Sequence, residues 1–160
     1  MIQRERRRIS LERHYRTTPA EIWELWTTAG GIESWWGPDG FEVRVRRIDL
    51  RPGGTLEYTM SAVGPDQIEF LKKAGMKLTT EHQATFTEVS PEHRLAYRHP
   101  ADFIPGVETY EVDTLVELEP TADGVRLVLT FDAMHDDHWT RLATMGWESQ
   151  LGRLAQLLDK

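Results

Sequence analysis

The most regular hydrophobic pattern lies at the end of the chain, over residues 136–160. Apolar side chains recur there at steps of three and four residues and form one stripe, made of Trp139, Ala143, Trp147, Leu151, Leu154 and Leu158. That spacing is typical of a helix with one buried face. Asp136 and Asp137 stand at its start and belong to the residue types that cap helices. The pattern predicts a long C-terminal helix.

Most of the preceding chain alternates between apolar and polar residues, which predicts strands with one buried and one wet face. The expected strands are residues 9–16, 41–46, 55–60, 78–89, 94–99, 107–119 and 125–131. Short turns separate many of them, which favours antiparallel pairing. In the strand at 107–119, the side chains expected to point inward are those of Tyr110, Val112, Thr114, Val116 and Leu118.

Three shorter segments are predicted to be helical. Thr18 is a suitable N-cap, Pro19 fits the first helical position and Glu21 completes a capping box. This helix is expected to end by Gly30-Gly31, and a second one to cover residues 32–36. A third is expected over residues 67–74.

The long amphipathic helix must bury its stripe, and the strands supply the surface that can cover it. We therefore expect an α+β fold in which an antiparallel sheet packs on the C-terminal helix. At 160 residues the chain fits a single domain over residues 1–160, with its core at about residues 9–158.

Composition and charge narrow the classes of function. The chain has no cysteine, which excludes disulfides and thiol chemistry and fits a cytoplasmic protein. We expect neither a secretory signal nor a membrane span, because no apolar run approaches the ~20 residues required. The net charge of the chain is −7. Residues 1–16 carry a local charge of +4, so the remaining residues carry −11. This acidic body argues against nucleic acid as a partner.

Several short motifs occur along the chain in an order and spacing that are fairly specific for one fold. They are Pro19-Ala20-Glu21-Ile22-Trp23 with Trp26-Thr27, Trp35-Trp36-Gly37-Pro38, Gly40-Phe41, Asp49-Leu50-Arg51-Pro52-Gly53-Gly54, Arg94-Leu95-Ala96-Tyr97 and Gly146-Trp147. Together they resemble the START-like, helix-grip (SRPBCC) superfamily and, within it, the family named after the activator of a heat-shock chaperone ATPase. The resemblance covers roughly residues 9–158.

This resemblance implies a curved antiparallel sheet gripping the C-terminal helix, two short helices after the first strand, and an internal cavity. Members of the superfamily bind lipids, polyketides, hormones and other apolar molecules, and some are aromatase/cyclases. Others serve chaperones, but the eukaryotic activators use an additional N-terminal domain, which we do not expect in a chain of this length. Residues 67–75 exceed the short turn expected at that place and are a candidate lid over the cavity.

The inner faces of the predicted strands and the helix stripe supply candidate ligand-binding residues. A cavity with apolar walls and a few polar groups is the usual form of a small-molecule site. The candidates are Tyr58, His82, Tyr97, Tyr110, Thr114 and Trp147, with His99 as an alternative to His82. The competing interpretation is a plain core in which the tyrosine hydroxyls reach the edge.

Trp35, Trp36 and Phe70 are the candidates for the pocket entrance. Adjacent tryptophans in a short helix point in different directions, so one can pack inward while the other faces an opening. The structural alternative is that they anchor the short helix on the sheet.

Metal and cofactor chemistry has little support in the sequence. His135-Asp136-Asp137-His138 contains metal-ligand types, but helix capping accounts for the aspartates, and we expect no metal. No cofactor is expected, because no phosphate-binding loop or Gly-x-Ser-x-Gly motif is present. No catalytic residue is assigned, since the carboxylates of residues 111–119 fall on the predicted wet face.

The sequence therefore predicts a protein that binds a hydrophobic or amphipathic, lipid- or polyketide-like small molecule. Two alternatives stay open. A polyketide cyclase- or hydrolase-like enzyme would need a His–Glu or His–Tyr pair inside the cavity. A chaperone-associated interaction module would need a large exposed apolar patch, with Phe103-Ile104 as its candidate, and a filled core. A homodimer is compatible with each.

Overall fold

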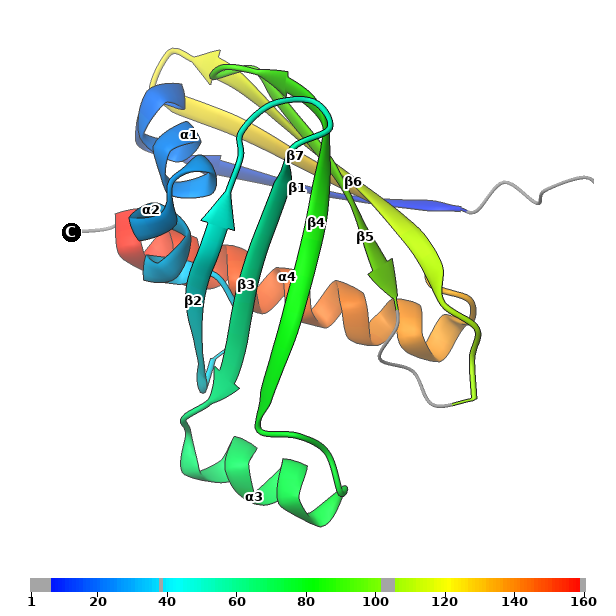
Figure 1. Ribbon diagram of the computed structural model, residues 1–160. Coiled ribbons are helices and arrows are strands. Elements are labelled where there is room, and N and C mark those ends of the chain that lie inside the picture. Colours follow the sequence, from blue (N-terminus) through cyan, green and yellow to red (C-terminus); the bar gives the residue numbers. More distant parts are fainter. Residues whose placement is uncertain (1–6, 38, 102–105, 159–160) are drawn as a thin grey trace, which may run out of the picture.

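The computed structural model describes residues 7–37, 39–101 and 106–158. The chain forms, in order, β1 (Arg8–Tyr15), α1 (Pro19–Thr27), α2 (Ala29–Trp35), β2 (Phe41–Ile48), β3 (Thr55–Ala62), α3 (Pro65–Lys73), β4 (Thr79–Ser90), β5 (Arg94–Ala101), β6 (Tyr110–Thr121), β7 (Gly124–Asp132) and α4 (Asp137–Leu158) (Figure 1). The predicted order of strands and helices is confirmed. Phe103 and Ile104 lie outside the described residues.

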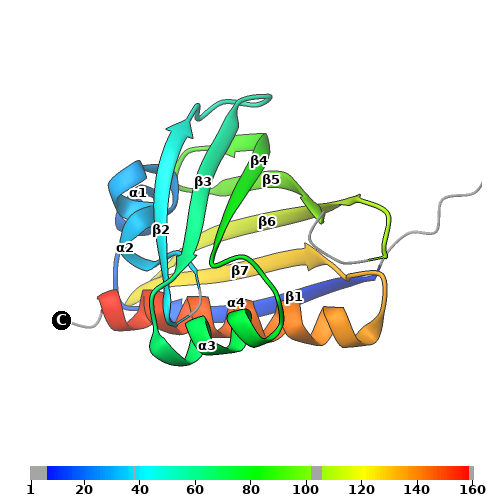
Figure 2. The same cartoon turned by 60° about the horizontal axis from the view of Figure 1, so that its bottom comes forward.

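The seven strands form one antiparallel sheet in the order β1-β7-β6-β5-β4-β3-β2. The first strand therefore lies beside the last, with Tyr15 opposite Val125. Helices α1 and α2 lie at one end of the sheet, and α4 runs across one face (Figures 1 and 2). This is the predicted α+β class, a sheet gripping its C-terminal helix.

The break between α1 and α2 lies at Thr28, so α1 ends before Gly30-Gly31 as predicted, but α2 begins at Ala29, three residues before the predicted start at residue 32. The Thr28 backbone is extended, and its hydroxyl accepts a 3.0 Å hydrogen bond from the Gly31 N–H. A threonine cap thus starts α2 before the glycines, which lie within its first turn. Gly31 is also sterically required, because a Cβ there would lie 2.4 Å from the Glu24 carbonyl oxygen.

The alternation in β6 sets its two faces as the sequence predicts. Val112, Thr114, Val116 and Leu118 are buried, while Glu111 and Glu119 are exposed. The strand itself begins at Tyr110, three residues after the predicted start at 107, and ends at Thr121.

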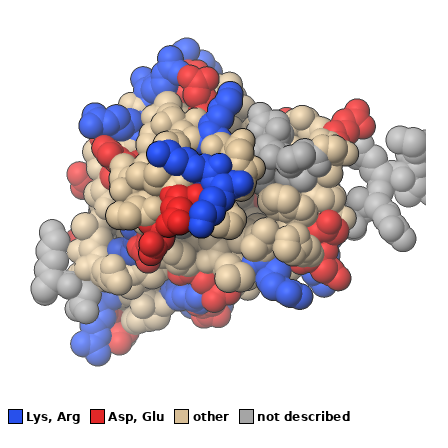
Figure 3. All heavy atoms as spheres, turned by 90° about the horizontal axis from the view of Figure 1, so that it is seen from below, with Lys and Arg blue, Asp and Glu red and all other residues tan. Residues whose placement is uncertain are grey.

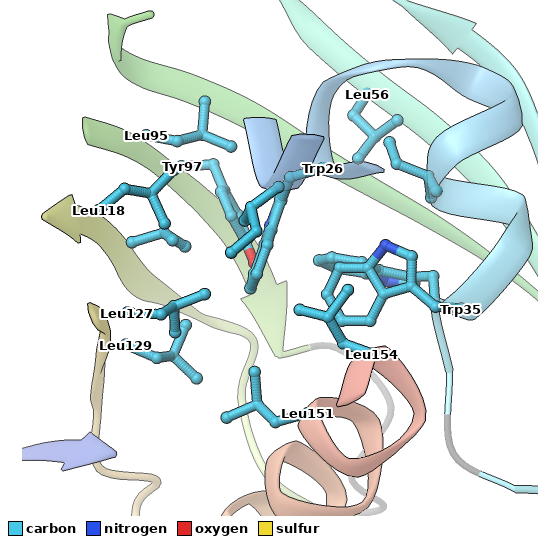
Figure 4. Packing of buried hydrophobic residues seen from close by; sticks show 14 of the residues in the cluster. Trp26, Trp35, Leu56, Leu95, Tyr97, Leu118, Leu127, Leu129, Leu151 and Leu154 are labelled. Atoms are coloured by element: carbon cyan, nitrogen blue, oxygen red, sulfur yellow. The ribbon is translucent and has the colours of Figure 1, made fainter. Parts of the chain in front are cut away.

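Helix α4 buries the C-terminal half of its stripe more deeply than the N-terminal half. Leu151 and Leu154 are 1% and 0% exposed, and they reach from α4 toward Trp26 and Tyr97 (Figure 4). Trp139 and Ala143 are half-buried, and Met145 is exposed. At the helix start, a side-chain oxygen of Asp136 accepts a 2.8 Å hydrogen bond from the Trp139 N–H, which confirms the predicted cap.

Helix α3 joins β3 to β4 at the far tip of the sheet (Figures 1 and 2). It starts two residues earlier than predicted, with Pro65 in the first turn, and it contains no buried residue. Groups of both charge signs are interspersed on the face of the molecule seen from below (Figure 3). Phe70 on this helix is 67% exposed.

Candidate functional site

A cavity of about 340 Å³ lies between α4 and the strands β3, β4 and β5. Sites for small ligands typically measure about 300–1,000 Å³, so this volume suits a small molecule. The lining residues come from five elements and the end of α2, and they are Trp36, Arg46, Leu56, Glu57, Tyr58, Met60, Glu81, His82, Gln83, Ala84, Tyr97, His99, Pro100, Trp147 and Gln150.

Trp36 is the centre of the aromatic wall. Its ring centroid lies 5.7 Å from that of Trp147, 6.3 Å from Tyr58 and 6.4 Å from Tyr97. Trp26 packs against its other side at 5.7 Å with an edge-to-face geometry. These aromatic contacts join α1, α2, two strands and α4 into one wall that offers flat apolar surface.

Two polar residues of the lining are buried, Tyr97 at 5% and Gln150 at 7% exposure, and the Tyr97 hydroxyl and the Gln150 side-chain nitrogen are covered by protein atoms. Burial raises the pKa of Tyr97 well above its usual value, with Tyr58 adding to the effect. Hydrogen-bonding interactions with the Trp26 and Thr114 side chains oppose this rise.

Tyr58 and His82 form a stacked pair in the wall. Their ring centroids are 5.1 Å apart and the planes are inclined by 15°. His82 Nε2 lies 2.7 Å from the Thr80 hydroxyl oxygen, which orients the imidazole. Burial raises the pKa of the Tyr58 hydroxyl, while its interaction with Trp36 partly opposes the rise. The tyrosine therefore stays neutral at physiological pH.

Charged side chains form the open edge of the cavity. The Arg46 guanidinium donates a 2.8 Å hydrogen bond to Glu81, and the two side chains are 61% and 76% exposed. Such an exposed pair contributes little to stability. Glu57 adds a second carboxylate to the lining.

The structure brings five of the nine predicted site residues together around this cavity, namely Trp36, Tyr58, His82, Tyr97 and Trp147. Trp36 belongs to the wall rather than to an entrance, because it is 6% exposed and packed among the other aromatic rings.

The other four predicted residues lie elsewhere. Trp35 is fully buried and its indole N–H donates a 2.8 Å hydrogen bond to the Leu25 carbonyl, so it anchors α2 instead of framing an entrance. Thr114 is 1% exposed and is absent from the cavity lining. Phe70 lies on a separate surface hollow with Phe41 and Leu71, so the α3 segment does not cover the cavity as the predicted lid would.

Tyr110 lies on the predicted inner face, but beside the start of α4. Its hydroxyl is 2.9 Å from His135 Nδ1 and also contacts the Met134 sulfur. It is therefore part of the junction between β7 and α4, away from the cavity lining.

Gln150 is one of the cavity residues that sequence reasoning missed. It stands beside Leu151 and three residues after Trp147, which places it at the border of the apolar stripe. Its position as a polar residue at the border of a buried helix face could have indicated that it lines the cavity.

The His135–His138 segment does not assemble a metal site in the described part of the chain. His135 Nε2 lies 3.3 Å from an Asp136 carboxylate oxygen, but no group of three or more ligand-type side chains converges among the described residues. Within those same residues, none of the helices combines the length and apolarity needed to cross a membrane.

The curved sheet, its long C-terminal helix and the cavity between them define a START-like, helix-grip domain of the SRPBCC superfamily. The family model described as "Activator of Hsp90 ATPase homolog 1-like protein" matches residues 16–159. The chain belongs to this family. A search among curated proteins gave no match.

Solved structures share the fold over nearly the whole chain. A protein from Chromobacterium violaceum is 22% identical with a TM-score of 0.78, over 96% of this chain and 97% of that one. An AHSA1 protein from Silicibacter pomeroyi is 20% identical with a TM-score of 0.74, over 96% and 98%. An AHSA1-like protein from Aeromonas hydrophila is 21% identical with a TM-score of 0.71, over 96% and 92%. At these identities the likeness establishes the fold.

Proposed function

We propose that this protein binds a hydrophobic or amphipathic, lipid- or polyketide-like small molecule in the cavity between the sheet and α4. The observation that carries the proposal is the cavity itself, about 340 Å³ in volume and walled by Trp36, Tyr58, Tyr97 and Trp147. A core packed to normal density would not leave such a volume beside aromatic side chains. Family membership accounts for the fold, whereas the residues that line the cavity indicate what it can bind.

The residues divide into two roles. Trp36, Trp147 and Leu56 cover the apolar part of the ligand, because burying apolar surface is worth about 25 cal/mol per Å². His82 orients it, since it is a half-buried polar residue of the cavity lining.

The test is native mass spectrometry of the purified protein, followed by denaturing extraction and identification of any released compound. Met60→Trp fills the cavity that Met60 lines, whereas Met145→Trp places the same side chain at a position that is 58% exposed. We expect an apolar compound on the wild type and on M145W, and its loss from M60W. A ligand-free wild type that shows no thermal shift with lipids or polyketides would contradict the proposal.

A second candidate function is that of a cyclase- or hydrolase-like enzyme, and the stacked Tyr58–His82 pair favours it. An imidazole in a cavity wall beside a tyrosine can exchange protons with a bound substrate. If the protein is an enzyme, His82→Gln should keep ligand binding and abolish turnover of the extracted compound. If it only binds the compound, neither the wild type nor His82→Gln should convert it.

The predicted partners and location have no further support beyond the sequence. Chaperone contact and a homodimer stay predictions, to be measured by co-sedimentation with a purified chaperone ATPase and by analytical ultracentrifugation. The cytoplasmic location likewise rests on the absence of cysteine.

A further inference from the structure

Gly146 lies in the middle of α4, at the border of the cavity wall. It directly precedes Trp147 and stands one helical turn before Gln150, and both of these residues line the cavity. Residues four apart in a helix are neighbours on its surface. Gly146 is half-buried, in keeping with a place between the core and the solvent. The glycine therefore belongs to the flank of α4 that borders the cavity.

This flank of α4 faces the β2 side of the sheet. Gly146 and Arg153 are seven residues apart, which is close to two full turns, so they point in nearly the same direction. The Arg153 guanidinium donates a 2.8 Å hydrogen bond to the carbonyl of Gly37, between α2 and β2. Strand β2 ends the sheet, and the cavity lining reaches it at Arg46, whose side chain is 61% exposed (Figure 1). The cavity thus opens between this flank of α4 and strands β2 to β4.

The fold does not require a glycine at position 146. A Cβ added there meets no atom of the described residues within 4 Å, whereas one at Gly31 would lie 2.4 Å from a carbonyl oxygen. Glycine is also the least favourable residue in a helix interior apart from proline. Gly152 in the same helix is equally unhindered among the described residues, but it is exposed to solvent. Gly146 differs in that its empty space borders the cavity.

Apolar side chains lie on both sides of this empty space. Leu142 stands one turn before Gly146 on the same flank of α4 and is 43% exposed. Met60 lines the cavity from β3. A ligand that passes Gly146 would therefore meet apolar surface at the rim and inside. Side chains in a helix lean toward its N-terminus, so one at position 146 would extend toward Leu142 and cover the space between them.

We propose that Gly146 keeps the entrance of the cavity open, so that the ligand enters and leaves between α4 and strands β2 to β4, past the bare backbone at this residue. This inference rests on the proposed function and adds the position that controls access to the site. A side chain at position 146 would narrow the entrance. Because it would lie outside the cavity, it would slow entry and exit and leave the contacts of the bound ligand unchanged.

The closing experiment follows the binding of N-phenyl-1-naphthylamine, a neutral apolar fluorophore, by stopped flow, through energy transfer from tryptophan. Gly146→Leu is compared with Gly152→Leu, which adds the same side chain on the exposed face of α4. We expect the association and dissociation rate constants of G146L to fall together by about tenfold, with the dissociation constant within about threefold of the wild type, because a narrowed entrance raises the barrier in both directions. G152L should match the wild type within about twofold.

Two controls accompany the kinetics. Both leucine variants should keep or raise the melting temperature, because leucine has a higher helix propensity than glycine and the added Cβ meets no described atom within 4 Å at either position. Met60→Trp should lose the fluorescence signal, because it fills the cavity that Met60 lines.

The outcomes separate this inference from the proposed function. Unchanged rate constants in G146L, with the probe bound, would overturn the entrance and leave the proposed function standing. A weaker G146L whose association rate constant is unchanged would make Gly146 part of the wall, which also overturns the entrance. No signal from the wild type, or equal signals from the wild type and M60W, would overturn the proposed function and the entrance with it.

Discussion

The Tyr15 hydroxyl in β1 donates a 3.1 Å hydrogen bond to the carbonyl oxygen of Leu151 in α4, across 136 residues of sequence. Tyr15 is 6% exposed and Leu151 1% exposed, so this bond lies inside the molecule. It ties the edge strand of the sheet to the helix that the sheet grips. The contact therefore reports on whether α4 is docked.

Tyr15 predicts a loss of stability in alkaline solution. Burial raises its pKa from 10.0 to about 12. A group whose pKa is raised by folding stabilises fully below its unfolded pKa, so the contribution is complete below pH 10 and is lost as pH rises from 10 to 12. The loss should reach about 2–3 kcal/mol, measured by urea unfolding at pH 8 to 12. Tyr58 and Tyr97, whose pKa values burial also raises, act in the same direction.

Tyr15→Phe is the control for this pH dependence. It should lower the free energy of unfolding at pH 8 by about 1 kcal/mol, because the bond to Leu151 is lost. Its decline between pH 10 and 12 should then be shallower than that of the wild type. An identical decline would show that Tyr15 does not carry the effect.

Gly30 and Gly31 are adjacent in α2 but should respond oppositely to alanine. A Cβ at Gly30 meets nothing within 4 Å, whereas one at Gly31 would lie 2.4 Å from the Glu24 oxygen and 2.7 Å from Leu25 Cα. We expect Gly30→Ala to raise the free energy of unfolding by about 0.5 kcal/mol and Gly31→Ala to lower it by about 1–3 kcal/mol. Thermal unfolding of both variants checks this, and similar effects of the two would contradict the position of the Thr28 cap.

Leu154 lies on the buried face of α4, and Leu142 lies on its exposed face. Leu154 is 0% exposed and Leu142 is 43% exposed. Leu154→Ala should cost about 2–5 kcal/mol because it leaves a cavity in the core. Leu142→Ala should change the free energy of unfolding by about 0.5 kcal/mol or less. Equal losses in urea unfolding would mean that α4 docks through a different face.

Changes at Trp35 should mainly lower the free energy of unfolding, whereas changes at Trp36 should mainly lower ligand affinity. Trp35→Phe loses the hydrogen bond to Leu25 and core contacts, so it should cost about 1–3 kcal/mol while leaving ligand affinity within twofold. Trp36→Phe removes aromatic surface from the cavity wall and should weaken binding of the compound extracted from the wild type about fivefold. Calorimetric titration of both variants measures the contrast, and a larger loss of affinity in W35F would reverse the assigned roles.

The fold followed from local patterns because side-chain direction is a local property. Alternation in β6 predicts that Val112 and Val116 face the core, and both are 2–3% exposed. The 3.6-residue period does the same for Leu151 and Leu154 in α4. The start of α2 was predicted three residues too late because glycine is a generic helix breaker, whereas the Thr28 side chain caps the helix before the two glycines.

The site was predicted in part, because membership of an inner face does not fix a position along it. Tyr97 and Tyr110 both lie on inner faces, on the neighbouring strands β5 and β6. Tyr97 lines the cavity beside Trp36, while Tyr110 meets His135 at the start of α4. The difference depends on where α4 crosses the sheet, which no local pattern contains.

Local patterns in the sequence are sufficient to predict the class of fold, the long C-terminal helix and the face that each strand buries. These depend on backbone geometry repeated every two or 3.6 residues. Long-range packing sets which residues enclose the cavity, that Gln150 is one of them, and that Trp35 packs away from it. A cavity is the volume left between elements distant in sequence, so its walls are set by long-range packing and not by the order of residues.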